Sequence, residues 1–95
     1  MTYRRCWGKE YLSDLNALES GLRTKVRSMT TLLAGNPYLP PSVAVKDAVR
    51  AIDVQHQAVL VYRIDPRAVL TFLLVRSYDS ASPADVSAAL DARLT

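Results

Sequence analysis

The chain has 95 residues, which is enough for one domain and too few for two. Hydrophobic residues make up 49% and charged residues 22%, a composition that excludes an intrinsically disordered chain. The net charge is +3, with an excess of positive charge over residues 1–76 and of negative charge over residues 77–95, so the body suits a polyanion or an acidic protein as well as ordinary solvation.

Membrane insertion and secretion are not expected. No segment reaches the roughly 18 consecutive apolar residues that a membrane span requires. The first residues, MTYRRCWGKE, are basic but have no apolar run behind them, unlike a secretory signal. We therefore expect a cytoplasmic protein.

The first third of the chain predicts a strand and two helices. Residues 2–7 alternate with period two, which is typical of a short strand, and Gly8 ends it. Residues 9–19 predict an amphipathic helix with Asp14 mostly off its apolar face, and Ser20-Gly21 interrupts the pattern. A second helix follows up to Gly35, which suits the left-handed position that ends a helix. The predicted apolar faces are Tyr11, Leu12, Leu15 and Leu18 on the first helix, and Leu22, Val26, Met29 and Leu33 on the second.

The rest of the chain predicts a proline-rich loop, three strands and a helix. Residues 36–42 (NPYLPPS) form a stiff crossover from the helices to the sheet. Residues 49–54, 58–64 and 68–75 predict strands joined by tight turns, which together form a meander. Ser82 and Pro83 can start a last helix with a thin apolar stripe of Val86, Leu90 and Leu94. The expected fold is α+β: an N-terminal strand, an antiparallel helical hairpin packed on an antiparallel β-sheet, and a short C-terminal helix, in one domain over residues 1–95.

This order of elements resembles the RelE/ParE superfamily of bacterial toxins. The similarity lies in MTYRR at the start, KEYLSDLNAL in the first helix, and VRAIDVQHQAVLVYRID running into AVLTFLLVRSY. It covers roughly residues 2–80, and the short helical hairpin looks more like the RelE and YafQ branches than the ParE branch. The resemblance implies the toxin of a type II toxin–antitoxin system. RelE and YafQ relatives cleave messenger RNA on the ribosome and are neutralised by an antitoxin, whereas ParE relatives act on DNA gyrase.

RNA cleavage by the ribose 2′-hydroxyl needs a proton acceptor, cations that stabilise the charged phosphorane, and a proton donor for the leaving oxygen. The resemblance places Arg50 at the family's first basic position and Arg76 near a basic position at the end of the last strand. These two arginines are candidates for a phosphate clamp or for plain surface charge. Tyr78 falls near a late histidine of the YafQ pattern, where it could stack on a base or donate a proton. His56, the one histidine, is a candidate base or simply a turn residue.

Two further basic residues, Lys46 and Arg63, are candidates for RNA binding. Other positions depart from the family pattern. Val59 stands where RelE-type toxins carry an arginine. Asp53 and Gln57 stand where the YafQ pattern has a histidine and an aspartate.

One His and one Cys, about fifty residues apart, predict no metal site, and no cofactor is expected. We expect a metal-independent endoribonuclease whose partners are an antitoxin protein, the ribosome and messenger RNA. Two alternatives remain open: a gyrase inhibitor, and a relative that has lost catalysis and only binds its antitoxin. A small partner is expected to lay an amphipathic helix or an extended segment over the sheet or the helical hairpin.

Overall fold

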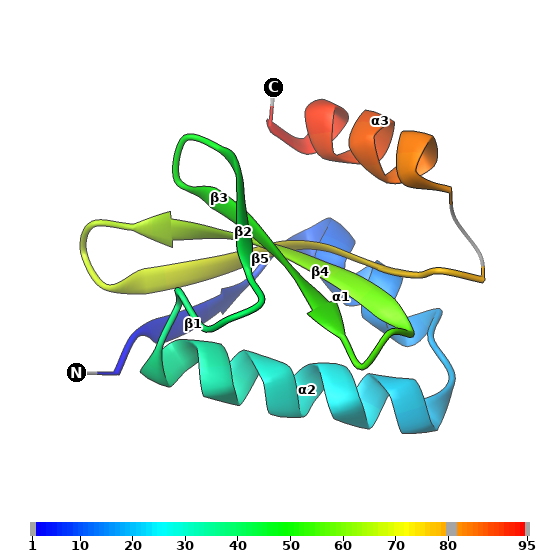
Figure 1. The fold of residues 1–95 in the computed structure, drawn as a ribbon, viewed down its shortest axis with the longest axis horizontal. Helices are drawn as coiled ribbons and strands as arrows, with labels where there is room; N and C mark the ends of the chain where they lie inside the picture. Colours follow the sequence, from blue (N-terminus) through cyan, green and yellow to red (C-terminus); the bar gives the residue numbers. More distant parts are fainter. Residues whose placement is uncertain (1, 80–81, 95) are drawn as a thin grey trace.

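The computed structural model describes residues 2–79 and 82–94. Its elements follow the predicted order, with one additional strand after the proline-rich loop (Figure 1). They are β1 (Arg4–Trp7), α1 (Lys9–Asn16), α2 (Ser20–Gly35), β2 (Val43–Lys46), β3 (Val49–Val54), β4 (Ala58–Asp65), β5 (Val69–Ser77) and α3 (Pro83–Leu94). The α+β fold predicted from the sequence is therefore confirmed.

All five strands belong to one sheet, in the order β1-β5-β4-β3-β2. The predicted meander of β3, β4 and β5 is antiparallel, and β2 extends it as an edge strand. β1 instead pairs parallel with β5, so the sheet is mixed rather than wholly antiparallel. The pattern did not reveal β2 because its four residues are all exposed and carry no burial periodicity.

The sheet lies between two helical layers (Figure 1). α2 covers one face, which we call the helix face, and α1 packs on it from the β5 edge of the sheet, where Asp14 accepts a bond from the Val75 N–H. α3 covers the opposite face, where Leu90 packs against Val49, Val61 and Leu74. The core of the helix face includes Tyr11, Leu15, Leu22, Val26, Leu33, Ile52, Leu60, Tyr62, Leu70 and Phe72. Among the described residues, no helix has the length and apolar character needed to cross a membrane.

A β-bulge in β5 determines which way its last residues point. Val61 pairs with Leu74 and Tyr62 pairs with Phe72, so Leu73 is an extra residue on β5. Before the bulge, Phe72 faces α1 and α2, and after it Val75 faces them. With regular alternation, Arg76 would point into the helix-face core. The bulge turns Arg76 to the α3 face.

Three details of the helical hairpin differ from the sequence prediction. α1 ends at Asn16, and Ser20 already belongs to α2, so the break is at residues 17–19, where buried Leu18 anchors the turn. Leu12 is 43% exposed rather than in the core. Gly35 is the last helical residue, and no described glycine has a positive φ. The chain leaves α2 through extended Asn36, because its side-chain oxygen accepts a bond from the Tyr38 N–H at 3.1 Å.

Candidate functional site

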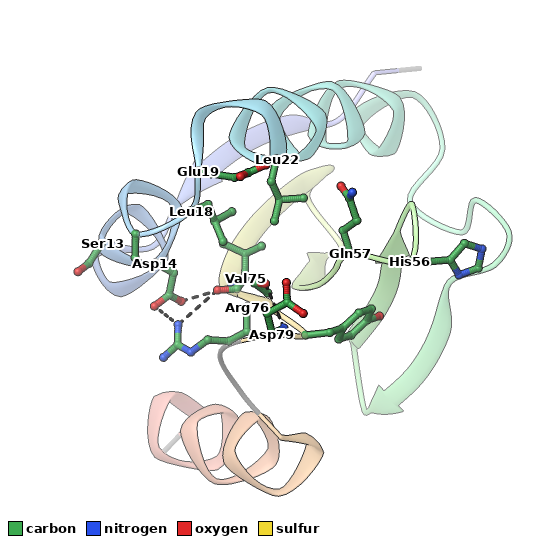
Figure 2. A pocket seen from close by; sticks show the side chains of 13 residues that line it. Ser13, Asp14, Leu18, Glu19, Leu22, His56, Gln57, Val75, Arg76 and Asp79 are labelled. Atoms are coloured by element: carbon green, nitrogen blue, oxygen red, sulfur yellow. Dashed lines mark hydrogen bonds and ion pairs between the residues drawn. The ribbon is translucent and has the colours of Figure 1, made fainter.

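A cleft of about 820 Å³ opens where the end of β5 meets the β3–β4 turn and the α1–α2 turn (Figure 2). Three of the four predicted catalytic residues, His56, Arg76 and Tyr78, line it. Its other lining residues are Ser13, Asp14, Ala17, Leu18, Glu19, Leu22, Gln57, Val75, Ser77 and Asp79. The structure therefore brings His56 to the same cleft as Arg76 and Tyr78, which stand 20 and 22 positions later in the sequence.

The β3–β4 turn holds His56 in an unusual backbone conformation. Gln55 and His56 have φ values of 50° and 61°, in the left-handed region that non-glycine residues rarely adopt. The Asp53 carboxylate supports the turn by accepting a bond from the His56 N–H at 2.8 Å. The imidazole itself lies at the rim of the cleft with its side chain 99% exposed, and its Nδ1 is 3.4 Å from Asp53 Oδ2. Figure 2 shows it pointing away from Arg76.

Tyr78 and Asp53 form a hydrogen-bonded pair beside this turn. The Tyr78 hydroxyl donates to Asp53 Oδ1, and the Tyr78 N–H donates to the Gln57 carbonyl at 3.0 Å. The Tyr78 bond is the main reason that the pKa of Asp53 lies below its ordinary value, with the nearby His56 contributing. Burial and then the bond to Asp53 raise the pKa of Tyr78 to about 12. At neutral pH the pair is therefore a carboxylate and a neutral phenol that can donate a proton.

Arg76 contacts a buried carboxylate. Asp14 on α1 forms ion pairs with Arg76 from β5 and with Arg93 from α3, and it also accepts a bond from the Val75 N–H at 3.3 Å. Arg93 adds bonds to the Leu73 carbonyl at 2.8 Å and to Glu10 at 2.9 Å. Its pKa is raised, first by the hydrogen bond to Asp14 and then by the charges of Asp14 and Glu10. Asp14 thus joins α1, β5 and α3, and it compensates much of the charge that Arg76 brings to the cleft (Figure 2).

Arg50 lies elsewhere, on the helix face of the sheet. Its guanidinium donates to Ser42 at 3.0 Å and stacks over the ring of Tyr38 with 5.1 Å to the centroid. In the strand register Arg50 is aligned with Tyr62 and Phe72, whereas Arg76 is aligned with Val59 and points to the α3 face. The phosphate clamp predicted from Arg50 and Arg76 is therefore wrong in geometry, since a whole sheet separates the two side chains.

Lys46 and Arg63, predicted as RNA contacts, lie at the other end of the sheet. Both are aligned with Val49, at the opposite end of β3 from the His56 turn. Arg63 stands five positions after Ala58, the β4 residue beside that turn, a span of roughly 17 Å. Their predicted role would require RNA to extend well beyond the cleft.

Solved structures of RelE toxins share this architecture. A mutant of the E. coli toxin RelE in the free state superposes with a TM-score of 0.77 at 15% identity, covering 99% of this chain and 96% of that one. The RelBE2 toxin–antitoxin complex of Mycobacterium tuberculosis gives 0.71 at 18% identity, covering 81% and 99%. An archaeal RelE–RelB complex from Pyrococcus horikoshii gives 0.67 at 15% identity, covering 85% and 100%.

This chain has the RelE fold. The resemblance predicted from the sequence is thus confirmed at the level of structure. No family model and no curated protein sequence matches the chain, so the likeness lies in the arrangement of elements rather than in shared residues.

The RelE fold clarifies the departure at Val59. In the register of the sheet, Val59 lies between Asp53 and Arg76 in one row across β3, β4 and β5. An arginine there would lie beside Arg76 and complete a pair of cations. In this chain Val59 instead lines an apolar pocket with Val86 and Leu90 of α3. Val59 therefore contacts α3 at the position where an arginine would have supplied a second cation.

Sequence reasoning missed Asp14 and Arg93. Asp14 was expected mostly off the apolar face of its helix, but it is buried beside β5. A signal was present, because Asp14 stands three residues after Tyr11 and four before Leu18, in the apolar stripe itself. Arg93 likewise stands three residues after Leu90 on α3. Within residues 2–79 and 82–94, no group of three His, Cys, Asp or Glu side chains could hold a metal ion.

Proposed function

We propose that this protein is the toxin of a type II toxin–antitoxin system and acts in the cytoplasm as a ribosome-dependent messenger-RNA endoribonuclease. The observation that carries the proposal is the cleft, where a RelE fold brings His56, Arg76 and the Tyr78–Asp53 pair together. These groups match the proton acceptor, cation and proton donor that metal-independent RNA cleavage requires.

Each group has a role that its geometry permits. His56 takes the proton of the ribose 2′-hydroxyl, because Asp53 lies next to Nδ1 and leaves Nε2 free to accept it. Arg76 contacts a phosphate oxygen through the part of its guanidinium that Asp14 does not engage. Tyr78 is neutral at physiological pH and protonates the leaving 5′-oxygen. The exposure of His56 means that RNA and ribosome must close this side of the cleft, which fits a nuclease that needs the ribosome.

The same solved structures also indicate a class of partner protein. The solved RelE structures include complexes with RelB-type antitoxins from M. tuberculosis and P. horikoshii. We propose that this chain also binds a cognate antitoxin protein.

A ribosome-containing translation extract tests the proposal directly. Purified wild-type protein is expected to cut a messenger RNA only while it is being translated, and His56→Ala, Arg76→Ala and Tyr78→Phe are each expected to slow cutting by about 100-fold. Arg67→Ala, in the β4–β5 turn away from the cleft, is the matched control and should cut at the wild-type rate. An intact message with wild-type protein would disprove the nuclease, and cutting by the His56 and Arg76 variants at the wild-type rate would disprove the roles assigned to these residues.

A second function is favoured by the charges in the cleft. Asp14, Glu19 and Asp79 line it together with Arg76, and Val59 replaces a cation in the neighbouring row. These carboxylates make the cleft less favourable for a polyanion such as RNA than a phosphate-binding site should be. A gyrase inhibitor, or an antitoxin-binding relative without catalysis, accounts for this. In a supercoiling assay, inhibition of gyrase by protein that leaves translation intact would establish the gyrase alternative.

A further inference from the structure

A second pocket, of about 350 Å³, lies between β1, α1 and α2. None of its lining residues belongs to the cleft at the end of β5. It is lined by Arg5, Trp7, Tyr11, Leu12, Leu15, Arg27, Thr30 and Thr31. We call this the Trp7 pocket, and no step of the proposed RNA chemistry uses it.

The Trp7 pocket contains a buried hydrogen-bond donor without a partner. Tyr11 is fully buried, and its hydroxyl has no hydrogen-bond partner among the described residues. Burial raises the pKa of Tyr11 to about 12, although the charges of Arg27 and Arg5 act in the opposite direction. The hydroxyl is therefore protonated at neutral pH and lies within the electrostatic reach of both guanidinium groups. Buried polar groups are normally paired, so the unpaired Tyr11 hydroxyl indicates that a bound partner supplies its hydrogen-bond acceptor.

The remaining walls combine positive charge with exposed apolar surface. The Arg5 guanidinium is held by the Thr30 and Thr31 hydroxyls at 3.3 and 3.1 Å, which fixes its position without neutralising it. Trp7 and Leu12 are each 43% exposed, although both types of side chain normally bury most of their surface. No carboxylate is present among the residues that line the pocket.

We propose that the Trp7 pocket binds an acidic side chain of a partner protein, in a segment where apolar residues flank the carboxylate. Arg5 and Arg27 pair with the carboxylate, the Tyr11 hydroxyl donates to it, and Leu12 and Trp7 contact the apolar neighbours. Single-stranded RNA fits less well, because the Trp7 ring already contacts Tyr11, Phe72 and the Arg5 guanidinium, which restricts stacking of a base.

Trp7 is the one tryptophan of the sequence, so its fluorescence reports on this pocket alone. The probe is a capped peptide with glutamate between leucines, and the matched peptide carries glutamine instead. The glutamate peptide is expected to change the fluorescence saturably and to bind about tenfold more tightly than the glutamine peptide, with the difference shrinking at high salt.

Tyr11→Phe and Arg27→Ala separate a binding role from a structural one. Tyr11→Phe should unfold no more easily than the wild type, because it removes an unpaired buried hydroxyl, yet it should bind the glutamate peptide about tenfold more weakly. Arg27→Ala changes an exposed side chain and should weaken binding similarly, while Arg63→Ala at the far end of β4 should not. Equal binding of the two peptides would overturn the proposal. So would a fluorescence response to oligouridylate, but not to the peptide, that Arg27→Ala abolishes.

Discussion

Asp14 illustrates how much of this molecule depends on single side chains. It is buried where α1, β5 and α3 meet, and it accepts bonds from Arg76, Arg93 and a backbone N–H. A buried carboxylate with two cationic partners is stable only as a set, because removing it leaves two guanidinium groups close together with only the exposed Glu10 as a counter-charge, on Arg93.

We predict that Asp14→Ala lowers the free energy of unfolding by about 3 kcal/mol, measured by urea denaturation. Glu10→Gln is the control, because Glu10 also pairs with Arg93 but its side chain is 65% exposed, and it should cost no more than about 0.5 kcal/mol. Equal effects of the two substitutions would show that the Asp14 cluster is not buried as the structure has it.

His56 and Ala68 both adopt positive φ, at 61° and 64°. Glycine relieves this conformation, so His56→Gly and Ala68→Gly should each raise the free energy of unfolding by about 0.5–1 kcal/mol. Only His56→Gly should abolish RNA cleavage. Thermal denaturation together with the extract assay checks both effects. Destabilisation by His56→Gly with stabilisation by Ala68→Gly would mean that the imidazole supports the fold rather than the chemistry.

The Tyr78–Asp53 pair predicts a pH dependence with a definite sign. Because the folded pKa of Asp53 is lowered from 3.8, its contribution to stability is full above that value and is lost as the pH falls through the lowered pKa. Tyr78→Phe removes the main cause of the shift. The difference in unfolding free energy between wild type and Tyr78→Phe should be constant from about pH 5 to pH 7 and should shrink below about pH 3.8. A difference that grows in acid would contradict the pairing.

The roles of these residues were only partly predictable. Hydrophobic periodicity identified the core positions Leu15, Val26 and Leu33, because burial repeats along a helix. It could not reveal that Asp14 is buried, since a carboxylate in an apolar stripe is informative only once its partners are known. Those partners, Arg76 and Arg93, are more than sixty residues away in sequence.

At the level of elements, the meander could be predicted because three apolar runs are separated by tight turns. The face that Arg76 occupies could not, because it depends on the bulge at Leu73. Leu73 stands in a continuous apolar run, LLV, in which both faces of the strand are buried. The sequence there shows no alternation of apolar and polar residues, so it cannot show at which residue the two faces exchange. The parallel pairing of β1 with β5 could not be predicted from the local sequence either.

α3 is held to the rest of the chain by one buried apolar side chain, Leu90, and by the ion pairs of Arg93. Leu90→Ala should speed amide hydrogen exchange over residues 83–94 by about tenfold or more while leaving β3, β4 and β5 protected, because Leu90 is the buried anchor of this helix. Ser87→Ala, at an exposed position at the rim of the pocket between α3 and the sheet, should leave the exchange unchanged. Loss of protection throughout the sheet would show that α3 unfolds only with the rest of the chain.

At the level of the whole molecule, two distinct pockets are proposed to serve two kinds of interaction. The cleft at the end of β5 carries the proposed RNA chemistry, and the Trp7 pocket on the other side of α1 carries a proposed protein contact. Arg50 lines neither of these pockets, since it lies beside Tyr38 at the proline-rich loop. The two proposed sites therefore share no lining residue.

The most direct test is to induce the protein in bacteria and map the 5′ ends of cellular messages. Wild type and Arg50→Ala are expected to arrest growth with new cuts inside translated frames, while Arg76→Ala and His56→Ala should give no such cuts, because only the latter two residues line the cleft. Cuts that persist in Arg76→Ala but vanish in Arg50→Ala, or growth arrest without any cuts, would contradict the account.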